Sequence, residues 1–129
     1  MRNSKAVILV VEDSTIIRMG AVDLVLSAGY EALEARDAHE AIRILESRDD
    51  IDLVFTDVQM SGAMNGIKLS HYIRDRWPPV KLIVASGKAI LEESSLPEGS
   101  HFFSKPYSDH AIADAMARML SSDRCLPPA

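Results

Sequence analysis

The sequence predicts an α/β domain in which helices cover both faces of a five-stranded parallel β-sheet, a doubly wound arrangement. Short apolar runs rich in valine and isoleucine recur along the chain, the first of them at 7–11. Runs without polar alternation are typical of strands that are buried on both faces. Segments with a helical spacing of apolar residues separate these runs, and regular alternation of strand and helix predicts a parallel sheet.

Ten elements are expected in all. The strands are expected at 7–11, 30–35, 51–56, 80–85 and 100–103, and the helices at about 15–28, 38–48, 67–76, 88–95 and 109–120. Asp13 or Ser14 can cap the first helix, and Gly29 can end it because glycine accepts a left-handed backbone. The helix at 88–95 has the weakest pattern, because the stretch 92–99 holds two serines, a proline and a glycine.

Length and composition favour one globular domain. The 129 residues, 47% of them hydrophobic, can supply a core for a single domain over 1–129, with that core at about 6–121 and a tail at 122–129. The net charge of −5 argues against a basic surface, so no direct nucleic-acid partner is expected. Cys125 has no second cysteine to pair with, and no apolar stretch approaches roughly 18 residues, which favours a cytoplasmic protein without membrane contact.

Polar side chains of catalytic type follow four of the expected strands. They are Glu12 and Asp13 after the first strand, Asp57 after the third, Ser86 after the fourth and Lys105 after the fifth. The carboxyl ends of parallel strands meet at one crevice, where such sheets bind their ligands. Taken singly, each residue has an ordinary explanation as a first-turn acid, a turn former or a solvated lysine.

Placed together, these residues predict a site for a hard divalent cation. At ~4 Å and an effective dielectric constant of ~20, each pair of carboxylates repels by about 4 kcal/mol. Oxygen ligands suit Mg²⁺, which would neutralise the cluster. In that setting Asp57 could act as a nucleophile toward a phosphoryl group, while Lys105 pairs with the phosphoryl charge and Ser86 donates a hydrogen bond to it.

Four short motifs extend this interpretation. The segments 10–13 (VVED), 56–60 (TDVQM), 84–87 (VASG) and 105–107 (KPY) closely resemble the receiver domains of bacterial two-component response regulators, the CheY-like superfamily. The resemblance is collinear from about residue 6 to residue 120. It implies a flavodoxin-like receiver fold with strand order 2-1-3-4-5.

The resemblance also implies roles for individual residues. Asp57 corresponds to the phospho-acceptor, Asp13 to a direct Mg²⁺ ligand and Glu12 to a ligand that acts partly through water. The backbone carbonyl of Gln59 corresponds to a further ligand of Mg²⁺.

Three more positions match the family pattern. Lys105 matches the lysine that contacts the phosphoryl group, and its bond to Pro106 is expected to be cis. Ser86 takes the place of the switch hydroxyl, and Phe102 that of the aromatic switch residue.

The implied function is Mg²⁺-dependent transfer of a phosphoryl group to Asp57 from a sensor histidine kinase or a histidine phosphotransfer protein. Phosphorylation would switch a surface that binds a protein target the sequence does not name. Such a domain is not an enzyme, since it catalyses only its own phosphorylation and dephosphorylation.

Three alternatives stay open at this point. The chain ends soon after Leu120, as expected for a stand-alone receiver in a phosphorelay. The Pro127–Pro128 pair could instead be a cut linker in a hybrid kinase or a DNA-binding regulator. An aspartyl-phosphate hydrolase is less favoured, because its acid/base aspartate two residues after the nucleophile is replaced here by Gln59.

Signal lifetime depends on access of water to the phosphoryl group. Gln59 and Lys88 stand two residues after the acceptor and two after the switch hydroxyl, beside the expected water path. Neither is a carboxylate that could act as a general base. We therefore expect them to shield the phosphoryl group and lengthen its lifetime.

Overall fold

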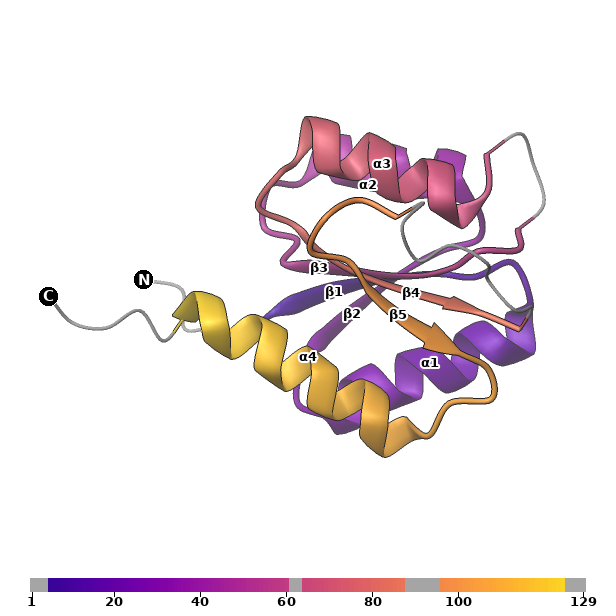
Figure 1. The fold of residues 1–129 in the computed structure, drawn as a ribbon, viewed down its shortest axis with the longest axis vertical. Helices are drawn as coiled ribbons and strands as arrows, with labels where there is room; N and C mark the ends of the chain where they lie inside the picture. The colour runs from indigo at the N-terminus through magenta and orange to yellow at the C-terminus, as the bar shows by residue number, and fades with distance from the viewer. Residues whose placement is uncertain (1–4, 61–63, 88–95, 125–129) are drawn as a thin grey trace, which may run out of the picture.

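The computed structural model describes residues 5–60, 64–87 and 96–124. It contains one parallel sheet with the order β2-β1-β3-β4-β5, as the resemblance implied (Figure 1). The strands are β1 (Val7–Val11), β2 (Glu31–Ala35), β3 (Leu53–Asp57), β4 (Lys81–Ser86) and β5 (His101–Ser104). Each strand lies within two residues of its predicted bounds.

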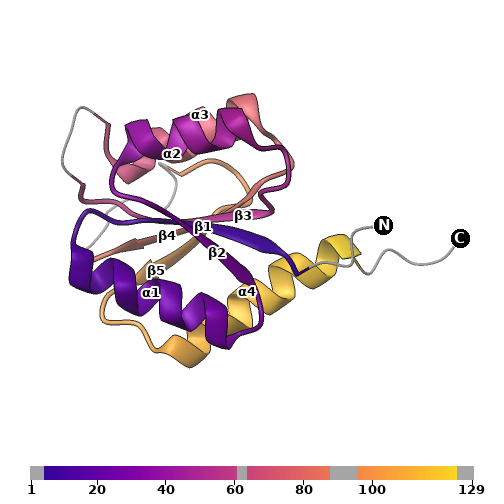
Figure 2. The ribbon, with the colours of Figure 1, turned by 180° about the vertical axis from the view of Figure 1, so that it is seen from behind.

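Helices lie on both faces of the sheet. They are α1 (Thr15–Ser27), α2 (Ala38–Ser47), α3 (Gly66–Arg76) and α4 (Asp109–Arg124). The pair α1 and α4 covers one face, and the pair α2 and α3 covers the other (Figures 1 and 2). The described ranges therefore contain four helices and not the predicted five, and the helix expected at 88–95 lies outside them.

The central strand β1 explains why its sequence shows no polar alternation. Ile8 and Val10 pack in the core beneath α1 and α4. Val7, Leu9 and Val11 pack in the second core, beneath α2 and α3. All five side chains are buried, since both faces of the strand are covered by helices.

The helix α1 buries less of its apolar surface than its sequence suggests. Ile16 and Leu26, which fit the helical spacing, are 80% and 54% exposed, and Ile17 is 45% exposed. Leu24 and Val25 do face the core, at 7% and 0% exposure.

No helix within the described ranges is long and apolar enough to cross a membrane.

The start of α1 decides which of two candidate residues caps it. The Ser14 hydroxyl accepts a hydrogen bond from the backbone N–H of Ile17 at 3.3 Å, so Ser14 and not Asp13 is the N-cap. Asp13 consequently keeps its carboxylate out of the cap. At the other end, Gly29 has a φ of +95°, the left-handed conformation predicted for it.

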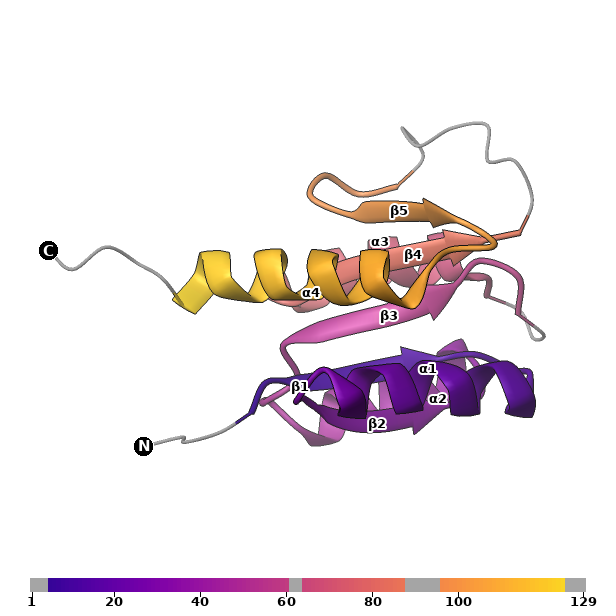
Figure 3. The same ribbon diagram turned by 90° about the horizontal axis from the view of Figure 1, so that it is seen from below.

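All strands point the same way, so their carboxyl ends share one edge (Figure 3). The register aligns Val11 with Thr56, and Asp57 with Ala85. Ser86 in turn aligns with Ser104, directly before Lys105. The residues that follow β1, β3, β4 and β5 therefore start from nearly the same level of the sheet.

The first residue of α3 lies against the backbone of the last residue of β3. The N–H of Gly66 donates to the carbonyl of Val58 at 2.9 Å. A Cβ atom at Gly66 would overlap the backbone carbonyl of Asp57 and lie 2.9 Å from Cα of Val58. Only glycine lets α3 approach this closely, because the groups it meets are backbone and cannot rotate away.

We expect Gly66→Ala to lower the free energy of unfolding by about 1–3 kcal/mol, since overpacking must displace backbone. Gly20→Ala is a matched control, because Gly20 lies inside α1 with no atom within 4 Å of the added Cβ. That control should gain about 0.5–1 kcal/mol from helix propensity. Urea denaturation of both variants measures the difference, and a Gly66→Ala variant as stable as wild type would contradict the packing argument.

Candidate functional site

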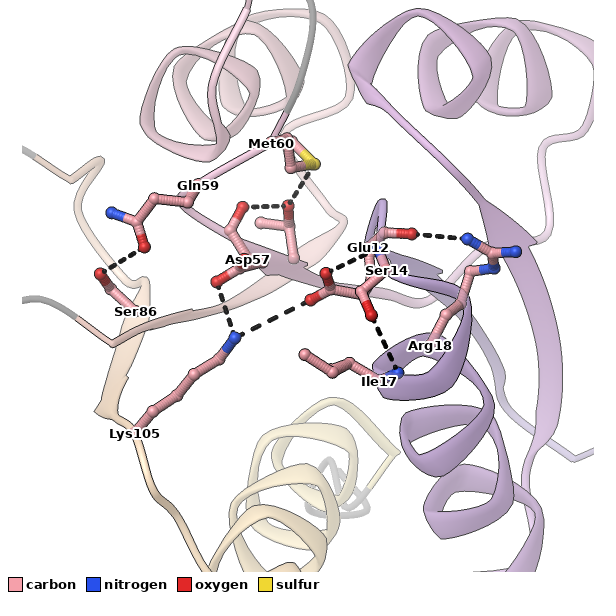
Figure 4. Close-up of polar contacts among 10 residues, drawn as sticks. Glu12, Ser14, Ile17, Arg18, Asp57, Gln59, Met60, Ser86 and Lys105 are labelled. Atoms are coloured by element: carbon pink, nitrogen blue, oxygen red, sulfur yellow. Dashed lines mark hydrogen bonds and ion pairs between the residues drawn. The ribbon is translucent and has the colours of Figure 1, made fainter.

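The Asp57 carboxylate lies at the end of β3 and is only 8% exposed. Burial raises the pKa of this carboxyl, and the charge of Asp13 raises it further, whereas Lys105 lowers it. The Nζ atom of Lys105 lies 3.1 Å from Oδ1 of Asp57 (Figure 4). This ion pair does not give Oδ1 a hydrogen bond of good geometry, so the buried oxygen keeps capacity for a further positive partner.

Glu12 is the second buried carboxylate, at 5% exposure. Its Oε2 accepts the backbone N–H of Ser14 at 3.0 Å, and its Oε1 lies 3.9 Å from Nζ of Lys105. Burial raises the pKa of the Glu12 carboxyl and the charge of Asp57 also raises it, while the Ser14 N–H and Lys105 lower it. The Lys105 ammonium group therefore lies between two carboxylates from different strand ends.

Asp13 completes the acidic group from a more exposed position. Its charge raises the pKa of the Asp57 carboxyl, and its proximity also raises the pKa of the Glu12 carboxyl. The predicted gathering of three carboxylates is thus present.

These carboxylates do not form a ready metal cage. Among residues 5–60, 64–87 and 96–124, no three acidic, histidine or cysteine side chains are placed to hold a metal ion by themselves. Mg²⁺ does not need such a cage, because it keeps several waters and binds through one or two carboxylates. The oxygen-only donor set and the unsatisfied Oδ1 of Asp57 fit a magnesium ion.

The Ser86 side chain is fully buried at the end of β4. Its hydroxyl donates to Oε1 of Gln59 over 3.4 Å (Figure 4). The sequence placed both residues near the acceptor but carried no signal that they contact each other, because 27 residues separate them.

The two phenylalanines of β5 point to opposite faces of the sheet, because they are consecutive in a strand. Phe103 packs against the core beneath α1 and α4 and stacks on His101, with ring centroids 4.9 Å apart. Phe102, the predicted switch residue, pairs in register with Val84 and is half-buried on the other face.

The expected cis bond between Lys105 and Pro106 is present. Lys88 lies outside the described residues.

Two further residues belong to the site and were not singled out from the sequence. Arg18 donates through Nη1 to the backbone carbonyl of Glu12 at 2.8 Å. Tyr107 lies beside Phe55, with ring centroids 5.9 Å apart, and lines the same pocket as Asp57 and Lys105. Tyr107 stood in the 105–107 motif but was given no role, and no local pattern marked Arg18.

Residues 8–117 match the response regulator receiver domain family. The chain belongs to this family. As a receiver it accepts phosphoryl groups in two-component signalling, and its relatives include both sensor kinases and response regulators.

One sensor kinase and one response regulator illustrate the two kinds of relative. The sensor kinase CckA of Brucella abortus is 35% identical over 124 residues, which is 92% of this chain and 13% of the kinase. The response regulator protein FleR of Pseudomonas aeruginosa is 34% identical over 116 residues, covering 88% of this chain and 24% of that protein. The receiver thus spans less than a quarter of the length of either relative.

A solved structure shares the fold. The response regulator TrrA of Thermotoga maritima, solved in complex with Mg²⁺–BeF, superposes with a TM-score of 0.77 at 23% identity. The match covers 88% of this chain and 98% of that one.

Magnesium should stabilise the receiver. At ~10 times its Kd the ion adds about 1.4 kcal/mol to the free energy of unfolding, which for this length raises Tm by roughly 5 °C. Asp57→Asn should remove most of this response. In EDTA at neutral pH the same variant should melt above wild type. The folded state raises the pKa of Asp57, so its ionised form costs stability, and that cost disappears as pH falls through the folded-state pKa.

Thermal melts with Mg²⁺ or EDTA measure both effects. Asp49→Asn is the matched control, because Asp49 is exposed and precedes β3 at the opposite edge of the sheet. Equal Tm values for wild type with and without Mg²⁺ would count against the site.

Proposed function

We propose that Asp57 is the phosphoryl acceptor and that its donor is a sensor histidine kinase or a histidine phosphotransfer protein. The observation that carries this proposal is a buried carboxylate with an unsatisfied oxygen, 3.1 Å from a lysine ammonium group at the carboxyl edge of a parallel sheet. The similarity to a sensor kinase supports a donor of this class.

In the transfer step a carboxylate oxygen of Asp57 attacks the phosphorus of a phosphohistidine. A P–O bond forms as the P–N bond breaks, and the histidine ring leaves with the electron pair of that bond. Lys105 already faces Asp57, so its ammonium group needs little movement to pair with a phosphoryl oxygen. Preorganised charge of this kind stabilises the transition state without reorganisation during the step.

A magnesium ion, held by Asp13, Asp57 and the backbone carbonyl of Gln59 with Glu12 acting through water, would neutralise the charge that gathers on the phosphoryl oxygens. Glu12 is anchored for this purpose by the N–H of Ser14. The structure of TrrA with Mg²⁺–BeF supports the choice of ion.

The switch begins at Ser86. Its hydrogen bond to Gln59 is long, 3.4 Å, and therefore weak enough to exchange for a bond to a phosphoryl oxygen. Movement of Ser86 changes the surroundings of β5, where the half-buried Phe102 pairs in register with Val84, two residues before Ser86. We assign the change of a protein-binding surface to this pair.

The receiver would act in the cytoplasm as a protein-interaction switch, without direct contact to nucleic acid or membrane, and without a separate substrate. A hydrolase is disfavoured because Gln59 stands where that mechanism needs an aspartate, and its amide contacts Ser86.

Incubation with acetyl phosphate and Mg²⁺ should add one phosphoryl group to the wild type, detected by intact-mass spectrometry. Asp57→Asn should abolish this labelling because it removes the nucleophile, and Asp49→Asn should leave it unchanged. Phosphate uptake by Asp57→Asn would disprove the assignment. Steady turnover of a phosphomonoester by the wild type would favour the hydrolase.

Gln59→Ala should shorten the lifetime of the phosphorylated state by roughly threefold, a change of about 0.6 kcal/mol in the barrier. The Gln59 amide lies over Ser86, next to the acceptor, where it restricts the approach of water. Loss of phosphate is followed by mass spectrometry after removal of the donor, with Lys68→Ala on the exposed face of α3 as control. A slower rate in Gln59→Ala would mean that the amide orients the attacking water instead.

A further inference from the structure

The turn between β1 and α1, residues 12–14, carries two of the three carboxylates of the site, and we call it the acidic turn. The register of β1 with β2 and β3 ends at Val11. The N–H of Glu12 still bonds to the carbonyl of Ala35 at 3.0 Å. The carbonyl of Glu12 lies beyond the ladder and takes its hydrogen bond from Nη1 of Arg18, at 2.8 Å (Figure 4).

Besides this bond to the Glu12 carbonyl, two further contacts hold Arg18 in place. Its backbone N–H bonds to the carbonyl of Ser14 at 2.8 Å, in the first turn of α1. Its Nε bonds to Oε1 of Glu34 in β2 at 3.0 Å, and the side chain is only 11% exposed. A buried guanidinium with two acceptors in fixed directions has little freedom, because its donors form a planar fork.

The peptide plane transmits this restraint to Asp13. The carbonyl of Glu12 and the N–H of Asp13 belong to one rigid peptide unit. Fixing that carbonyl fixes the direction in which the chain leaves β1, and hence where the Asp13 carboxylate stands relative to Asp57. The Asp13 charge does act on Asp57, whose pKa it raises.

Arg18 contacts the acidic turn through a backbone carbonyl and not through a carboxylate of that turn. The cation that lowers the pKa of both Glu12 and Asp57 is Lys105. The guanidinium of Arg18 instead faces a backbone carbonyl and Glu34, which is 53% exposed. Its effect on the site therefore passes through the position of the acidic turn.

We propose that Arg18 is a positioning residue, whose bond to the Glu12 carbonyl holds the acidic turn in the orientation that binds magnesium. The role deepens the proposed function, on which its magnesium readout rests. Loss of such a supporting contact typically weakens metal binding at least roughly tenfold.

The test compares four variants at a temperature well below their melting points. Arg18→Ala should weaken the Kd for Mg²⁺, measured by calorimetry, by roughly tenfold. Arg18→Lys keeps the charge but cannot reach both the Glu12 carbonyl and Glu34 at once. Its Kd for Mg²⁺ should therefore lie between those of the wild type and Arg18→Ala. Glu34→Gln keeps an oxygen acceptor and should change the Kd by less than Arg18→Ala.

Arg36→Ala is the matched control. It removes the same charge from the segment after β2, where Arg36 is 72% exposed and pairs only with Glu40 among the described ion pairs. This variant should bind Mg²⁺ as the wild type does.

A second readout needs no metal. In EDTA, Arg18→Ala and Arg18→Lys should shift the amide NMR signals of residues 12–14 and of Asp57, and Arg36→Ala should leave these signals in place. A merely structural role would lower Tm without changing the Kd of the folded protein. The proposal is overturned if either Arg18 variant, while folded, keeps the wild-type Kd or the wild-type signals at 12–14. A wild type that binds no Mg²⁺ would refute the magnesium site instead, and the metal-free NMR comparison would still decide the role of Arg18.

Discussion

Burying the Asp57 carboxylate at the end of β3 costs free energy, because an ionised group loses its hydration there. The nearby ammonium group of Lys105 offsets part of that cost. Lys105 comes from the end of β5 to lie 3.1 Å away, and it also faces Glu12 from the end of β1. Burial still raises the pKa of both carboxyls, and a divalent cation at this edge would offset that cost.

The backbone around this carboxylate is held as firmly as the side chains. Gly66 brings the start of α3 against the backbone of Asp57, and Arg18 ties the acidic turn to α1 and β2. Both contacts act on main-chain atoms. Asp57 and the acidic turn are therefore held by the scaffold, and the long 3.4 Å hydrogen bond from Ser86 to Gln59 is the contact that we propose to exchange on phosphorylation.

Much of this arrangement was predictable. Strand and helix alternation predicted the sheet, and β1 lacks polar residues because helices cover both its faces. The residues placed at the strand ends do converge, since parallel strands end at one edge. The patterns were less informative about α1, where Ile16 and Leu26 fit a helical period yet face outward. Periodicity indicates that a helix forms, but the direction it faces depends on what packs against it.

The chemical groups at the carboxyl edge could be identified from local patterns, because a strand period and a strand end are local properties of the chain. How those groups pair became clear from the folded arrangement alone. It joined Ser86 to Gln59, and it placed Arg18 between the Glu12 carbonyl and Glu34 of β2. These pairings depend on which strands are neighbours and on the level at which each one ends, and the packing of the whole sheet sets both.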